Sequence, residues 1–277
     1  MSTHEEGRFP GSAGGEIYWQ AWLPKPVTSV VLLSHGYAEH SGRYGHVADR
    51  LNRAGYAVYA VDHRGHGRSD GTPGNVDGFR YVLNDLGRLR EKATAAHPHV
   101  PVFLLAHSLG ALIALDYVTS GGADGLAGLA LSGAVLDPTV ANKVELAIAP
   151  LLSRIAPNLG TSAIDPAGVS RDPAVVAAYV ADPLNYHGKI RSRSGAESLS
   201  AIARVIDRLP SLTLPTLVMH GAEDPISAPS GSQTVVDRIG TEDLTVKFYD
   251  GLFHEIFNEP EQDAVLDDVV AWLDSRR

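Results

Sequence analysis

The feature that most constrains the fold of this chain is a regular alternation between short apolar runs and longer amphipathic segments. Apolar runs occupy residues 29–33, 56–61, 102–105 and 126–131, with helix-like segments at residues 44–54, 79–96 and 109–118 between them. The alternation returns at residues 215–219, 230–239, 244–249 and 261–273. Strands that are apolar on both faces are typical of a parallel sheet covered by helices on both sides. We therefore predict an α/β fold with a mostly parallel central sheet flanked by helices.

The alternation lapses over residues 133–209, which we interpret as an insertion into a single domain of residues 1–277. The spacing of one apolar helical face is shared by Val144, Ile148, Leu151 and Leu152. Prolines are expected to divide the segment into short pieces, and they stand at Pro138, Pro150, Pro157, Pro166, Pro173 and Pro183. We predict a helical cap over the carboxyl ends of the strands. The alternative is that its apolar face only packs against the core.

The amino-acid composition argues against several classes of binding partner and of chemical site. The chain has a formal net charge of −9, whereas proteins that bind nucleic acid usually present a basic surface, so we expect no nucleic-acid partner. It has no cysteine, which excludes thiolate nucleophiles and cysteine metal sites. Residues 1–15 lack the basic and apolar regions of a secretory signal, and no apolar stretch approaches the ~20 residues of a spanning helix. We expect a cytoplasmic protein whose membrane contact is at most peripheral.

The clearest chemical motif is Ala106-His107-Ser108-Leu109-Gly110, which lies between the apolar run at 102–105 and a helix-like segment. A nucleophile elbow needs this strand, turn and helix order, with small residues two positions on either side of the nucleophile. Strain in the tight turn lifts the hydroxyl above the sheet. Ala106 replaces the usual glycine, which requires the neighbouring helix to lie slightly farther away. We predict Ser108 as the nucleophile, the alternative being an ordinary serine in a loop.

With this motif the chain resembles the α/β-hydrolases. Two further strings, HGYAEHSGRY at residues 35–44 and DHRGHGRS at residues 62–69, are similar to those of monoacylglycerol lipases and bacterial lysophospholipase-like esterases. The resemblance covers nearly the whole chain. It implies the α/β-hydrolase fold, the chain order serine, acid, histidine, and hydrolysis of monoacylglycerols through an acyl-enzyme without a cofactor. A broader carboxylesterase or lysophospholipase, or a catalytically silent binding protein on this fold, are the alternatives.

A serine hydroxyl needs a histidine to take its proton and a carboxylate to hold that histidine in the right tautomer. His254 follows the strand-like residues 244–249 and precedes the last helix, where this fold places its base, whereas His220 is expected to be structural. Asp224 follows the run at 215–219 and is favoured as the acid. Its rivals are Asp243, at the wrong edge of its strand, and Asp250, in a turn.

Two further expectations concern the oxyanion and the acyl chain of the substrate. The oxyanion that forms during acyl transfer should accept hydrogen bonds from the backbone N–H groups of Leu109 and Tyr37. We expect the cap residues Val144, Ile148, Leu151 and Leu152 to line the acyl entrance and to contact lipid aggregates.

The histidines near Asp62 lack the i, i+4 spacing of a zinc protease, so we predict no metal site. Asp62 and Arg64 are instead expected to hold the loop after residues 56–61, with Gly65 and Gly67 providing its turns.

Overall fold

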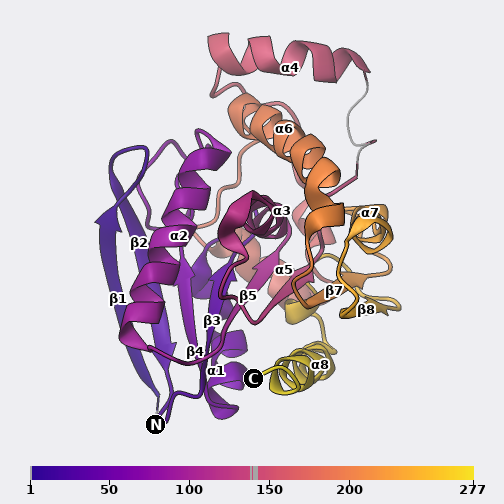
Figure 1. The fold of residues 1–277 in the computed structure, drawn as a ribbon. Coiled ribbons are helices and arrows are strands. Elements are labelled where there is room, and N and C mark those ends of the chain that lie inside the picture. The colour runs from indigo at the N-terminus through magenta and orange to yellow at the C-terminus, as the bar shows by residue number, and fades with distance from the viewer. Residues whose placement is uncertain (1, 138, 140–142) are drawn as a thin grey trace.

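The computed structural model describes residues 2–137, 139 and 143–277, and of residues 143–146 the backbone alone. Within these residues eight strands form one sheet in the order β1-β2-β4-β3-β5-β6-β7-β8 (Figure 1). The strands are β1 (Thr3–Pro10), β2 (Glu16–Leu23), β3 (Ser29–Ser34), β4 (Tyr56–Val61), β5 (Val102–His107), β6 (Gly128–Ser132), β7 (Thr216–Gly221) and β8 (Leu244–Tyr249). Strands β3 to β8 pair in parallel, as predicted.

The two strands that the alternation does not predict form an N-terminal hairpin. β1 pairs antiparallel with β2, and β2 pairs antiparallel with β4, so the hairpin extends the parallel sheet at one edge. The side chains of β1 are mostly exposed and many are polar. Such a strand lacks the continuous apolar run by which buried parallel strands are recognised.

Helices cover both faces of the sheet. They are α1 (Gly45–Arg53), α2 (Phe79–Ala96), α3 (Leu109–Tyr117), α4 (Lys143–Ile155), α5 (Pro173–Ala181), α6 (Ser192–Arg208), α7 (Ser230–Arg238) and α8 (Gln262–Asp274). Side chains of β3 alternate between two buried clusters. Val30 and Leu32 belong to the cluster that includes residues of α2, α3, α6 and α7, whereas Val31 and Leu33 belong to the cluster that includes residues of α1 and α8. This explains why the strands are apolar on both faces, and it confirms the predicted α/β architecture.

The segment between β6 and β7 contains α4, α5 and α6. The expectation that prolines divide it into short pieces is only partly right. Pro173 begins α5, where its missing N–H needs no partner, but α4 continues through Pro150. Pro150 is exposed, so water can hydrate the carbonyl group that loses its helical partner. Pro138 lies outside the described residues.

The two long helices of this segment have different surroundings. Ala201 and Val205 of α6 are fully buried in the core, and α4 packs on the outer side of α6, at the top of the molecule in Figure 1. α6 therefore packs against the core, whereas α4 packs against α6. No helix in the described part of the chain is long and apolar enough to cross a membrane.

Candidate active site

The site lies where the order of the strands reverses. From β3 the chain passes to β4 on one side and then to β5 on the other, so β3 and β5 are neighbours that lead to opposite halves of the sheet. In open α/β sheets, ligands bind beyond the carboxyl ends of the strands at such a point. The loops that follow β3 and β5 contain Tyr37 and Ser108.

The turn after β5 has the geometry of a nucleophile elbow. Ser108 has φ 53° and ψ −120°, a strained conformation for a residue with a side chain. A Cβ atom at Gly110 would lie 2.2 Å from the Ser34 carbonyl oxygen, so only glycine allows α3 to approach β3 this closely. Ala106 is buried in the core, and the departure from glycine is accommodated there.

Three predicted residues from distant parts of the chain meet at this turn. The Ser108 hydroxyl lies 2.9 Å from His254 Nε2, and His254 Nδ1 lies 2.6 Å from Asp224 Oδ2. With Nδ1 protonated, His254 donates to the carboxylate and Nε2 is free to accept the serine proton. All three side chains are less than a tenth exposed. The arrangement can therefore generate a serine nucleophile in a site largely closed to water.

Asp224 is held as an ionised acceptor. Burial by itself would raise its pKa, but hydrogen bonds from His220 and His254 outweigh burial and lower it. Its other oxygen accepts the backbone N–H groups of Ile226 and Ser227 at 2.8 and 3.0 Å. The rival acid Asp243 instead accepts a hydrogen bond from Arg276 at an exposed site. His220, expected to be structural, contacts the acid and also accepts from Ser232.

His254, the predicted proton acceptor, has an unusual electrostatic environment. Burial would lower the pKa of His254, yet Asp224, Glu255 and Glu39 together raise it. The ring of His107 lies 4.7 Å from the His254 ring, centroid to centroid, and burial lowers the pKa of His107 to about 3. His107 is therefore neutral at physiological pH and does not repel a protonated His254.

The two predicted oxyanion donors, Leu109 and Tyr37, lie at the start of α3 and in the loop after β3, close to Ser108. Leu109 is the first residue of α3, so its N–H has no partner within the helix. Gly36 lies beside the nucleophile, since a Cβ atom there would be 3.1 Å from the Ser108 Cβ. The Tyr37 hydroxyl is directed elsewhere and donates to the Gly74 carbonyl at 2.8 Å. Only the backbone N–H of Tyr37 is then available to act as the predicted oxyanion donor.

Asp62 and Arg64 bind the loop after β4 as expected. Asp62 accepts from the Ser41 backbone and hydroxyl and from the Arg68 backbone, and Arg64 pairs with Asp77. Gly65 and Gly67 have positive φ. Among the residues with described positions, no cluster of three or more potential metal ligands is found.

Sequence reasoning missed three charged residues next to the site. Glu39 and Arg43 lie within the HGYAEHSGRY string, and Glu255 directly follows His254. All three are almost buried and form one ion-pair network. Their position beside the motif and the histidine was the available signal, but charged residues are ordinarily exposed, so nothing in the sequence indicated burial.

Comparison with known proteins agrees with this geometry. The profile of the hydrolase family described as serine aminopeptidase, S33, matches residues 25–261. The chain is 41% identical to a monoacylglycerol lipase of Mycolicibacterium smegmatis over 98% of both chains. It is 32% identical to a monoglyceride lipase of Rattus norvegicus, over 95% of this chain and 88% of the relative.

Solved structures give the same result. The monoacylglycerol lipase of Paleococcus ferrophilus aligns with a TM-score of 0.84 and 28% identity over 100% of both chains. A soluble variant of the Saccharomyces cerevisiae monoglyceride lipase, in complex with a substrate analogue, aligns with a TM-score of 0.88 and 26% identity over 100% of this chain and 96% of the other. The chain thus belongs to the α/β-hydrolase family described as serine aminopeptidase, S33.

Proposed function

We propose that this protein is a serine hydrolase that cleaves monoacylglycerols to glycerol and a free fatty acid. The hydrogen-bonded chain from Ser108 through His254 to Asp224 carries the proposal, because it is the arrangement that activates a serine hydroxyl. The monoacylglycerol and monoglyceride lipases among the similar proteins support the class of substrate.

The proposed reaction has two steps. Ser108 attacks the ester carbonyl while His254 takes its proton, and the backbone N–H groups of Tyr37 and Leu109 stabilise the oxyanion. His254 then returns the proton to the departing glycerol oxygen, leaving an acyl-enzyme. A water molecule, deprotonated by His254, releases the fatty acid and restores the serine. This chemistry needs no cofactor.

We further propose that residues 133–209 form a cap through which the acyl chain enters. Ser108 is only 7% exposed, so a substrate needs a path past these residues. Ile148 and Leu151 on α4 are 51% and 62% exposed, which supports contact with a lipid aggregate. Leu152 is partly buried, and the side chain of Val144 lies outside the described residues. On this proposal the protein is cytoplasmic and associates peripherally with membranes or micelles.

Replacement of the nucleophile tests the reaction class. Ser108→Ala should fold normally and lose turnover by roughly a thousandfold or more, because the acyl-enzyme can no longer form. A fluorophosphonate probe, which reacts with activated serines, should label the parent chain and leave the variant unlabelled. Ester hydrolysis by Ser108→Ala near the parental rate would refute the assignment. An unlabelled and inactive parent would instead favour a catalytically silent binding protein.

The substrate class needs a separate experiment. The rival readings are a broader carboxylesterase and a lysophospholipase, and they differ in the alcohol and acyl parts that the site accepts. We expect kcat/KM for long-chain monoacylglycerols to exceed that for short soluble esters and for lysophospholipids of the same acyl chain. Equal values for short esters and monoacylglycerols would favour a broad carboxylesterase.

A further inference from the structure

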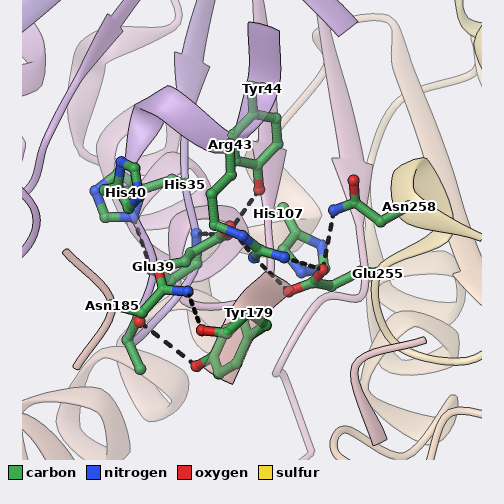
Figure 2. Close-up of polar contacts among 12 residues, drawn as sticks. His35, Glu39, His40, Arg43, Tyr44, His107, Tyr179, Asn185, Glu255 and Asn258 are labelled. Atoms are coloured by element: carbon green, nitrogen blue, oxygen red, sulfur yellow. Dashed lines mark hydrogen bonds and ion pairs between the residues drawn. The ribbon is translucent and has the colours of Figure 1, made fainter. Parts of the chain in front are cut away.

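Arg43, Glu39 and Glu255 form a buried network of one cation and two anions (Figure 2), and Glu255 directly follows His254 in the chain. Arg43 Nη1 donates to Glu39 Oε2 at 2.9 Å and to Glu255 Oε1 at 2.6 Å, and Nη2 donates to Glu255 Oε2 at 2.7 Å. The side chains of Arg43, Glu39 and Glu255 are 11%, 3% and 6% exposed. Arg43 is thus the bridge between two carboxylates that come from opposite ends of the chain.

Glu39 holds the loop that follows β3. Its Oε1 accepts the Gly36 backbone N–H at 2.6 Å and the Tyr44 hydroxyl at 2.7 Å. Gly36 directly precedes Tyr37, whose N–H is the proposed oxyanion donor. The carboxylate thus holds the peptide group that precedes the Gly36–Tyr37 peptide, and the carbonyl of the latter lies 2.7 Å from His35 Nδ1. Glu39 therefore helps to fix the backbone from which the Tyr37 N–H projects.

Glu255 holds the loop that carries the proposed base. It follows His254 in the chain, and its backbone N–H donates to the Val169 carbonyl at 2.8 Å. Its carboxylate binds Arg43 through both oxygens and also accepts from Asn258 at 2.9 Å. The position of Glu255 therefore limits where the backbone of His254 can lie.

Arg43 also touches the segment between β6 and β7. Its guanidinium group lies 4.9 Å from the centre of the Tyr179 ring on α5, which covers the network from that side, as Figure 2 shows. Burial would lower the pKa of Arg43, but Glu255 and Glu39 raise it, so the residue stays charged. A buried ion pair often adds little net stability, because desolvation offsets the attraction. A bidentate arginine does, however, fix the relative positions of the carboxylates that it binds.

We propose that Arg43 is a positioning residue that fixes the oxyanion loop relative to the loop carrying His254. The inference rests on the proposed serine-hydrolase function. Both steps of that reaction use the same N–H donors and the same histidine, and misplacement by about 1 Å can reduce rates roughly a hundredfold. Loss of the bridge should therefore reduce kcat and leave the binding of a small ester nearly unchanged.

The test variant is Arg43→Lys, assayed with a short soluble ester well below its melting temperature. Lysine keeps the positive charge, but its single ammonium group cannot bind both carboxylates in the fork geometry of arginine. We expect kcat to fall roughly 10- to 100-fold with KM within about twofold, and fluorophosphonate labelling to slow in proportion. The matched control is Arg276→Lys, because Arg276 also binds one carboxylate through two nitrogens, that of Asp243, which directly precedes β8 at the end of the strand opposite the site. It should retain the parental kcat.

A double-variant cycle keeps the inference testable even where Arg43→Lys is unstable. Glu255→Gln is nearly isosteric and weakens the same bridge from the other side. If both act through the bridge, the combined variant should lose little more activity than either single variant.

Parental kcat in Arg43→Lys, a loss confined to KM, or fully additive losses in the cycle would overturn the positioning role. An inactive parent that the probe does not label would instead overturn the proposed function itself.

Discussion

His254 is the residue whose surroundings make the most direct prediction about activity. Acidic groups face it from two elements: Asp224 on the loop after β7 and Glu39 on the loop after β3, with Glu255 next to it in the chain. Arg43 neutralises part of this charge, and His107 contributes none because its pKa is low. The imidazolium form that arises during proton transfer is therefore stabilised relative to an ordinary histidine.

The pH dependence should follow from this environment. The base must be neutral to accept a proton, so kcat/KM should rise with pH through the pKa of His254, with a midpoint above the ordinary value of about 6.5. Glu255→Gln removes one of the negative charges that stabilise the imidazolium, so its midpoint should move to lower pH. A pH–rate profile of both proteins measures this. A midpoint that stays in place or moves upward would show that Glu255 does not influence the base electrostatically.

α4 is the element for which the sequence left two interpretations open, an apolar face that contacts lipid and one that packs against the core. Apolar residues at helical spacing usually mark the buried face, yet Ile148, Leu151 and Ile155 are all at least half exposed. The helix contacts the protein mainly through α6 and stands at the outer end of the molecule (Figure 1). An exposed apolar face of this kind is typical of surfaces that bind lipid or another protein.

The double variant Ile148→Ser, Leu151→Ser tests the lipid contact. Full burial of each side chain in an apolar phase is worth about 1.5–3 kcal/mol, so binding to lipid vesicles should weaken by roughly tenfold or more. Long-chain monoacylglycerol turnover should fall as well, whereas short soluble esters should be unaffected because the triad is unchanged. With a net charge of −9, binding should depend little on salt.

Val246→Ser is a suitable control, because Val246 is an exposed valine on β8, and β8 lies well away from α4 (Figure 1). It should alter neither vesicle binding nor long-chain turnover. A lower melting temperature of the α4 variant with equal losses on short and long esters would mean that the helix face only packs the cap.

At the scale of the whole molecule, one sheet separates two hydrophobic clusters. Leu86 of α2 belongs to one cluster and Leu51 of α1 to the other, and both are fully buried. Neighbouring residues of the central strands β3 to β7 contribute to opposite clusters. Loss of packing on one face should therefore weaken strands on which the other face also depends. The two faces should therefore unfold together.

Leu86→Ala and Leu51→Ala test this cooperativity. Each should lower the free energy of unfolding by about 2–5 kcal/mol, because each leaves a cavity in a packed core. Denaturation followed by circular dichroism should show a single transition in both variants, with kcat per folded molecule near the parental value. A second, earlier transition in only one variant would show that the faces unfold separately.

The six parallel strands could be predicted from the sequence. Five of them, β3 to β7, are buried on both faces and therefore read as apolar runs, whereas β8 is partly exposed and was recognised by its place in the alternation. The sequence by itself also determined the elbow at Ser108, whose strand, turn and helix are contiguous. His254 and Asp224 followed from their places after two of those strands together with the resemblance to α/β-hydrolases. Local periodicity, however, does not specify which partner covers a face. The structure was needed to show that α4 exposes its apolar face while one face of α6 is buried in the core. It was also needed to show that Arg43 meets Glu255, 212 residues away in the chain. An ion pair of that span leaves no periodic signal, since its energy depends on burial and geometry that exist only after folding.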